Sequence, residues 1–389
     1  MCVLAVLAPG QGSQKPGFLT PWLTESSTEA RLRWWSALAG LDLLHLGTAA
    51  DTDEIKDTAR TQPLLVAAAL LAAEHLPLTD STPLVVAGHS VGELGAAGIA
   101  GVLTPDAAVT LAAVRGREMA AACALEPTGM SAVLGGTEDE VLAAIEAAGV
   151  YPANRNGAGQ IVAAGSVEGL EKFAAVPPAK ARIIPLSVAG AFHTTYMAPA
   201  EAALAAVASG ITPADPHRIL LSNLDGTAVP SGAAMLRRLV AQVTAPVRWD
   251  LCMQTMADLG VTAIIELPPA GTLAGLAKRA LKGVEIVTVN APEDLVAARE
   301  LIARHAGSPT HEPMPHFRVV VAAASGNFIP AADIAEGAEI TAGTVIGHVT
   351  TRQGDVDVIT HASGVLTEWL AHHNDPVAPG HPLARIGGH

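Results

Sequence analysis

Cysteine and positive charge are both scarce in this chain of 389 residues. Its three cysteines, Cys2, Cys123 and Cys252, are far apart and lack metal-binding spacing, so we expect neither a disulfide scaffold nor a metal site. This cysteine usage indicates a reducing compartment, the cytoplasm. Lysine and arginine number 23 against 37 acidic residues, and the net charge of −14 argues against nucleic acid as a partner, because phosphate binding needs a basic surface.

Long hydrophobic runs are also missing. The longest apolar run, residues 64–73, is far shorter than the roughly 20 residues of a membrane helix, so we expect no membrane partner. No basic residues precede the apolar run at 3–8, which therefore predicts a first core strand rather than a signal peptide. Half of the residues are hydrophobic and only 15% are charged, so the composition favours a sizeable folded core over disorder.

Strand-like and helix-like segments alternate up to about residue 300, which predicts an α/β fold with a parallel sheet covered by helices. Residues 126–187 form a smaller pattern of strand, helix, strand, helix and strand. That pattern predicts a ferredoxin-like subdomain inserted between two parts of the main core, residues 1–125 and 188–305. Three prolines and a glycine make residues 306–315 a linker, behind which residues 316–389 hold short strands and turns.

Ser90 carries the strongest chemical signal. It is the centre of Gly88-His89-Ser90-Val91-Gly92, which follows an apolar strand-like run and precedes small residues at helical spacing. This order predicts a nucleophile elbow of the kind found in α/β-hydrolase-like folds. The turn would place the Ser90 hydroxyl at a helix N-terminus, where the Val91 N–H can stabilise an oxyanion.

Three further features narrow the chemistry. The loop Gly10-Gln11-Gly12 follows the first strand, but Lys15 replaces the third glycine of a dinucleotide fingerprint, so we expect an oxyanion-hole N–H from Gln11 instead. Arg115 lies in an apolar predicted helix, where an inward guanidinium would need a carboxylate partner. His193 follows the small insertion and is one of 14 histidines, a weak candidate by itself.

Together these segments resemble the malonyl-CoA:acyl carrier protein transacylase family, in its actinobacterial fatty-acid-synthesis form. The matching segments lie in family order over roughly residues 1–300: Ala8–Gln14, Thr61–Pro63, Gly88–Glu93, Arg115-Gly116, Asn154–Gly165, Gly190–His193, Pro246–Trp249 and Glu266–Gly271.

The resemblance implies a mechanism and its residues. Ser90 would attack the malonyl-CoA thioester with His193 as general base, and the malonyl group would pass to holo acyl carrier protein. The N–H groups of Gln11 and Val91 would hold the oxyanion, and Arg115 would pair with the free malonate carboxylate. A backbone carbonyl near Gln242 would orient the histidine. The resemblance also implies substrate-binding roles for Gln62, Met119, Asn154, Gln160 and Phe192.

Two finer expectations follow from the resemblance. Phe192, next to His193, is the bulky residue that goes with malonyl rather than methylmalonyl in related acyltransferases, since a ring leaves less room for a methyl group. Acyl carrier proteins are acidic, so docking needs a local basic patch. The candidates are Lys180, Arg182, Lys278 and Arg279, with Arg155 and Lys282 as further candidates.

The segment 316–389 resembles the biotinyl/lipoyl hammerhead domains, which implies a flattened barrel of two similar halves. In that family the modified lysine lies on the hairpin between the halves, here Thr351–Asp355. No lysine follows Lys282, and arginine cannot form the usual amide. We therefore expect neither biotin nor lipoate, and a structural or docking role for this domain.

Two alternatives stay open at this point. A serine thioesterase or esterase acting on acyl-CoA would use the same elbow, although the inward arginine and the lack of an acidic triad member argue against it. A non-catalytic scaffold that docks a carrier protein is the other, and the intact serine, histidine and arginine argue against that.

Overall fold

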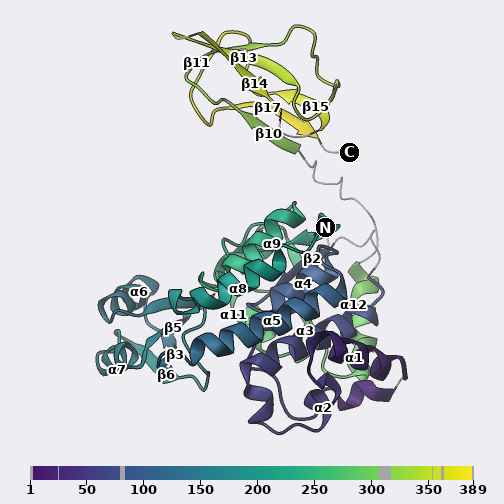
Figure 1. Cartoon of the computed structure of the whole chain (residues 1–389), viewed down its shortest axis with the longest axis vertical. Coiled ribbons are helices and arrows are strands. Elements are labelled where there is room, and N and C mark those ends of the chain that lie inside the picture. The colour runs from purple at the N-terminus through teal and green to yellow at the C-terminus, as the bar shows by residue number, and fades with distance from the viewer. Residues whose placement is uncertain are drawn as a thin grey trace. The chain divides into compact units, whose positions relative to one another are not determined.

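The computed structural model describes residues 3–24, 26–78, 84–305, 317–352, 354–360 and 363–387. The chain divides into two compact units, Met1–Pro309 and Thr310–His389. Figure 1 shows the helix-rich first unit and the strand-rich second unit. The predicted linker at 306–315 lies outside the described residues.

A five-stranded parallel sheet forms the centre of the first unit, in the order β7-β2-β1-β8-β9. Its central strand β1 is apolar throughout, because both of its faces are covered. Leu4 and Val6 point into one core, whereas Ala5 and Leu7 point into the other. The strands are β1 (Val3–Ala8), β2 (Leu84–Gly88), β7 (Ile219–Leu220), β8 (Val261–Glu266) and β9 (Glu285–Thr288).

Helices cover both faces of this sheet. The larger core holds residues of α1 (Ser26–Ala39), α3 (Thr58–Glu74), α4 (Gly92–Ile99), α5 (Pro105–Cys123) and α12 (Leu295–His305). The smaller core holds residues of α10 (Trp249–Asp258) and α11 (Thr272–Ala280). The other helical elements are η1 (Thr20–Thr24), α2 (Leu43–Thr48), η2 (Glu54–Lys56), η3 (Thr195–Met197), α8 (Ala198–Ala208), α9 (Gly232–Ala241) and η4 (Pro292–Asp294).

A small antiparallel sheet interrupts this pattern, at the side of the first unit where Figure 1 shows α6 and α7. Its strands lie in the order β4-β5-β3-β6 and have a core of their own. The elements are β3 (Thr128–Gly135), α6 (Glu138–Ala147), β4 (Tyr151–Gly157), β5 (Gln160–Ser166), α7 (Val167–Ala175) and β6 (Ala181–Pro185).

The three strands predicted for this region were one too few. The missed strand, β4, reads Tyr-Pro-Ala-Asn-Arg-Asn-Gly and has few of the residues that favour strands. It forms an edge of the sheet, which is where a proline is tolerated. Its pairing with β5, rather than its own composition, makes it a strand.

The second unit is built from two four-stranded sheets, ordered β10-β17-β15-β12 and β14-β13-β11-β16. Phe328, Val349, Leu366 and Ile386 belong to its separate core. The strands are β10 (Phe317–Val321), β11 (Gly326–Pro330), β12 (Glu339–Ile340), β13 (Val345–Thr351), β14 (Gly354–Ile359), β15 (Gly364–Trp369), β16 (Asp375–Val377) and β17 (Pro382–Gly387).

The described residues contain neither a membrane-spanning helix nor a cluster of metal-ligating side chains. Among these residues, no helix combines the length and the apolar character needed to cross a membrane. The same residues contain no group of three or more histidine, cysteine, aspartate or glutamate side chains placed to hold a metal ion.

Candidate active site

Ser90 occupies a sharp turn between β2 and α4. Its φ of 53° is left-handed, as a strained nucleophile elbow requires. The turn packs tightly on the end of β1, where the His89 N–H donates to the Ala8 carbonyl at 3.1 Å. A Cβ at position 92 would lie 2.2 Å from the Ala8 carbonyl oxygen, so only glycine fits there. The elbow thus lies at the carboxyl end of two adjacent parallel strands.

His193 lies beside the serine. Its Nε2 is 2.7 Å from the Ser90 Oγ, and its Nδ1 is 2.9 Å from the Gln242 main-chain oxygen. A carbonyl can only accept a hydrogen bond, so Nδ1 carries the proton and Nε2 is left to accept from the serine hydroxyl. This carbonyl is available because Gln242 caps the C-terminus of α9, where carbonyls lack intrahelical partners.

Burial keeps this histidine neutral. His193 is 4% exposed, and that burial, reinforced by the positive charge of Arg115, lowers its pKa from 6.5 to about 3. The hydrogen bond to the Gln242 carbonyl opposes this shift without reversing it. At neutral pH the ring is therefore free to take a proton from Ser90.

Arg115 reaches the site from α5 and is 2% exposed. Its Nη1 donates to the Gln62 Oε1 at 2.7 Å, and its Nη2 donates to the Gln242 Oε1 at 3.0 Å and to the Ser90 Oγ at 3.3 Å. Burial lowers its pKa to about 10, against the opposing charge of Glu93, so it remains a cation at neutral pH. A buried cation next to a nucleophile suits a substrate that carries an anionic group.

Gln62, Met119 and Phe192 are also among the predicted site residues. Gln62 is buried on α3, and its Nε2 lies 3.5 Å from the Met119 Sδ on α5. Phe192, 7% exposed, immediately precedes His193 in a loop where the Ala191 N–H donates to the Thr128 Oγ1 at 3.0 Å. The structure thus brings Ser90, His193, Arg115, Gln62, Met119 and Gln242 into one contact network.

The two residues predicted for an oxyanion hole lie on neighbouring loops. Val91 is buried and begins the turn into α4, and Gln11 follows the end of β1. The Gln11 side chain donates to the Thr58 Oγ1 at 3.5 Å. Because β1 and β2 pair in register from Leu4 with Leu84 to Ala8 with Gly88, the loops that follow them emerge at the same sheet edge.

Asn154 and Gln160 belong to the small antiparallel sheet. Asn154 bridges Val247, and its Oδ1 is buried without a hydrogen-bond partner among the described residues. Gln160 begins β5 and pairs with Leu134 of β3. None of the polar contacts described for these two residues reaches Ser90. The predicted docking residues Lys180, Arg182, Lys278 and Arg279 are exposed, the first two beside or within β6 and the others on α11.

Sequence reasoning gave no role to two residues beneath the site. Asn223 is fully buried, and its Oδ1 accepts from the Ser90 N–H at 2.8 Å. Glu93, 1% exposed, accepts from the Asn223 N–H at 2.7 Å and from the Gln242 amide. Burial raises the pKa of Glu93 above its usual value, while the Asn223 hydrogen bond and the Arg115 charge lower it. Two features of the sequence could have indicated these residues: Asn223 comes soon after the strand β7, and Glu93 lies in the first turn of the helix α4.

A serine at a strand–helix elbow, paired with a neutral buried histidine on a parallel α/β sheet, defines the class of serine-dependent acyl-transfer enzymes. The chain belongs to the acyl transferase family, whose model, "Acyl transferase domain", matches residues 7–299. Figure 1 shows these residues within the first unit.

Curated relatives of this chain are named malonyl CoA-acyl carrier protein transacylase. The chain is 57% identical over 296 residues to the malonyl CoA-acyl carrier protein transacylase of Mycobacterium tuberculosis, covering 75% of this chain and 98% of that protein. It is 35% identical over 315 residues to the Escherichia coli K12 transacylase of the same name, covering 77% of this chain and all of that protein.

Solved structures agree with these relatives. The crystal structure of the M. tuberculosis transacylase matches with a TM-score of 0.74 and 56% identity, over 76% of this chain and 99% of that one. A malonyl-transacylase in complex with its type II polyketide synthase acyl-carrier protein matches with a TM-score of 0.71 and 30% identity, over 77% of this chain and 99% of that one.

Proposed function

We propose that this protein transfers a malonyl group from malonyl-CoA to the phosphopantetheine thiol of holo acyl carrier protein, through an acyl-enzyme on Ser90. The observation that carries the proposal is the Ser90–His193–Gln242 carbonyl arrangement beside the buried cation of Arg115. The product would supply fatty acid or polyketide synthesis. Both substrates and the cysteine usage fit the predicted cytoplasmic location.

In each half of the reaction, His193 first accepts a proton and then donates it. His193 Nε2 takes the Ser90 proton as Oγ attacks the thioester carbonyl, and it returns that proton to the coenzyme A sulfur as the carbon–sulfur bond breaks. In the second half, it takes the proton of the phosphopantetheine thiol as the sulfur attacks the Ser90 ester. Collapse of this second intermediate returns the proton to Oγ. The N–H groups of Gln11 and Val91 would hold both oxyanions.

Arg115 would pair with the free malonate carboxylate. Two amide oxygens, on Gln62 and Gln242, hold its guanidinium in place, and Met119 supports Gln62. Because the guanidinium is already held in position before the substrate binds, binding requires little further loss of side-chain freedom. Phe192 would disfavour a methyl-branched extender, a preference worth roughly 1–3 kcal/mol for one methyl group. Asn154 and Gln160 remain proposed substrate contacts.

The finer description of the fold is likewise proposed. The elbow supports an α/β-hydrolase-like core, and the β-α-β-β-α-β succession with strand order β4-β5-β3-β6 supports a ferredoxin-like insertion. Lys180, Arg182, Lys278 and Arg279 remain candidates for contact with an acidic carrier protein.

For the second unit we propose a hammerhead-like flattened barrel without a prosthetic group. Its two four-stranded sheets around one core support the barrel. The hairpin between β13 and β14 joins Thr351 to Gly354, and the chain has no lysine there to carry biotin or lipoate. A structural or docking role then remains for this unit.

Intact-protein mass spectrometry tests the proposal. The protein is mixed with malonyl-CoA, with and without holo acyl carrier protein, and Ser90→Ala is the matched variant. We expect one malonyl adduct that moves to the carrier and is absent in Ser90→Ala. Rapid release of free malonate without transfer would favour the thioesterase alternative, and no adduct with retained carrier binding would favour the scaffold.

A further inference from the structure

A buried carboxylate lies beneath the active site and takes no part in the proposed reaction. Glu93 is in the first turn of α4, three residues after Ser90. One of its carboxylate oxygens accepts from the Asn223 main-chain N–H at 2.7 Å, and the other accepts from the Gln242 Nε2. Both neighbours are donors, so both oxygens of this side chain act as hydrogen-bond acceptors.

This carboxylate determines which way the Gln242 amide faces. With Nε2 directed at Glu93, the Gln242 Oε1 is directed at Arg115, whose Nη2 lies 3.0 Å away. The same Nε2 also donates to the Asn223 Oδ1 at 3.1 Å. The hydrogen-bond directions therefore run from Arg115 through Gln242 to Glu93. Reversing the amide would place two donors against each other at Arg115 and two acceptors against each other at Glu93.

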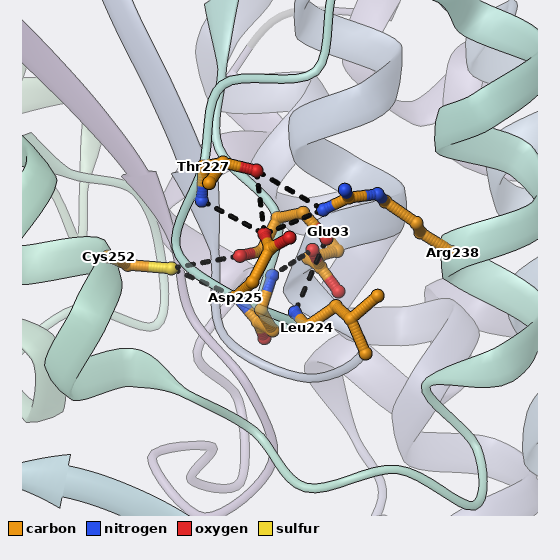
Figure 2. Close-up of polar contacts among 8 residues, drawn as sticks. Glu93, Leu224, Asp225, Thr227, Arg238 and Cys252 are labelled. Carbon is orange, nitrogen blue, oxygen red and sulfur yellow. Dashed lines mark hydrogen bonds and ion pairs between the residues drawn. The ribbon is translucent and has the colours of Figure 1, made fainter. Parts of the chain in front are cut away.

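The Asn223 partner is itself held in a fixed loop. Figure 2 shows Asp225 between Thr227 and Arg238, with Glu93 and Cys252 directed at the same loop. Arg238 of α9 donates to the Asp225 Oδ1 at 2.6 Å, and the Cys252 Sγ donates to the Ser222 carbonyl at 3.4 Å. Glu93 thus receives its hydrogen bonds from groups whose own positions are constrained.

We propose that Glu93 is a positioning residue. Through the Gln242 amide, it fixes the direction in which Arg115 presents its guanidinium beside Ser90, and so sets the preference for acyl groups that carry a free carboxylate. The inference rests on the proposed role of Arg115 as the partner of the malonate carboxylate.

The substitution Glu93→Gln has an expected effect on Arg115. Its single acceptor oxygen can satisfy either the Asn223 N–H or the Gln242 Nε2, and its amide nitrogen then opposes the other donor. The Asn223 N–H belongs to the main chain and cannot turn away, so we expect the new oxygen to face it and the new amide nitrogen to oppose the Gln242 Nε2. Gln242 can relieve this conflict only by turning its own Nε2 toward the Arg115 Nη2, and the conflict then reaches Arg115.

The test compares Ser90 acylation by malonyl-CoA and by acetyl-CoA, which has no free carboxylate. Glu93→Gln is expected to lower the malonyl-to-acetyl ratio roughly tenfold, the effect of a lost hydrogen bond to a charged group. The double variant Glu93→Gln/Gln242→Glu lets the new amide donate to a carboxylate that also accepts from Arg115. We expect it to bring the ratio back to within about threefold of the wild type.

Two control variants distinguish a positioning role of Glu93 from a role in folding and from a failure of the proposed function. Glu146→Gln removes an exposed carboxylate from α6 and should leave the ratio unchanged. Arg115→Ala reports on the proposed function itself. If Arg115→Ala leaves the ratio unchanged, the Arg115 role and this inference both fail; if it lowers the ratio and Glu93→Gln does not, only this inference fails.

Equal losses with both acyl donors, together with a lower melting temperature and no recovery in the double variant, would show a structural role for Glu93 and overturn the proposal. If Glu93→Gln does not fold, the double variant decides alone. A ratio near that of the wild type supports positioning, and a ratio as low as that of Arg115→Ala contradicts it.

Discussion

The histidine of this site is supported by a neutral group rather than by a carboxylate. The Gln242 carbonyl fixes the tautomer of His193 but brings no negative charge to stabilise an imidazolium. Arg115 adds a nearby positive charge that disfavours the protonated ring further. The site therefore keeps the proposed general base neutral around pH 7, and the lowered pKa of His193 makes the folded protein less stable in acid.

We predict that stability falls with acid because of His193. The unfolded chain takes up this proton near pH 6.5, whereas the folded protein does so only at about 3. The unfolded state then binds more protons between these values, so stability is present above pH 6.5 and is lost as the pH falls toward 3. Urea unfolding at pH 7.5 and 4.5 should show a loss about 2–3 kcal/mol larger in the wild type than in His193→Gln. Equal losses would contradict a depressed pKa.

At this scale the sequence predicted the candidate reacting groups and the Gln242 carbonyl beside His193, but it gave no role to Glu93 and Asn223. Ser90, His193 and Arg115 follow from local patterns and the family resemblance, and the structure places them within hydrogen-bonding distance of one another or of a shared partner. The role of Glu93 depends on how many donors surround it, and those donors come from positions 223 and 242, distant in the chain. A sequence pattern within one segment does not show how many hydrogen-bond donors from distant segments surround a side chain.

At the scale of elements, the site depends on how closely α4 approaches β1. A Cβ at Gly92 would meet the Ala8 and Pro9 carbonyl oxygens at 2.2 and 2.8 Å, both backbone atoms that cannot rotate away. Three residues further along the same helix, a Cβ at Gly95 would meet only the Ala8 and Ala69 methyl groups at 3.5 and 3.6 Å. Position 92 therefore requires glycine, whereas position 95 has room for a methyl group.

We predict opposite effects for alanine at these two positions. Gly92→Ala should push α4 and the elbow off the sheet, cost about 1–3 kcal/mol of unfolding free energy and abolish Ser90 acylation. Gly95→Ala should be neutral or stabilise α4 by up to about 1 kcal/mol, because alanine favours helix and ordinary contacts receive its methyl group. Thermal unfolding and adduct formation measure both effects. Acylation retained in Gly92→Ala would contradict the close approach.

Element type followed from periodicity wherever a segment is apolar and covered by others. The strand predicted at 3–8 has the same bounds as β1. The edge strand β4 was missed because it has few apolar residues, and backbone pairing with β5 makes it a strand. The sequence therefore predicted the strand that buries apolar side chains and missed the strand β4, which depends on backbone pairing.

At the scale of the whole molecule, the chain combines two units with separate cores. The proteins that it resembles are matched over 98–100% of their own length by about three quarters of this chain. The matched part, residues 7–299, lies wholly within Met1–Pro309. Every residue proposed for acyl transfer belongs to that unit, so the proposed chemistry draws no side chain from the second unit.

We therefore predict that a protein ending at Pro309 retains malonyl transfer, with acylation and transfer rates within about twofold of the full chain, because no core residue of the first unit is removed. Adduct formation on Ser90 and transfer to holo acyl carrier protein should be measured separately. Acylation preserved with transfer lost would assign carrier docking to the second unit, since malonyl-CoA needs only the first. Loss of both steps in a folded truncated protein would contradict the separation and would make the β-rich unit part of the active machinery.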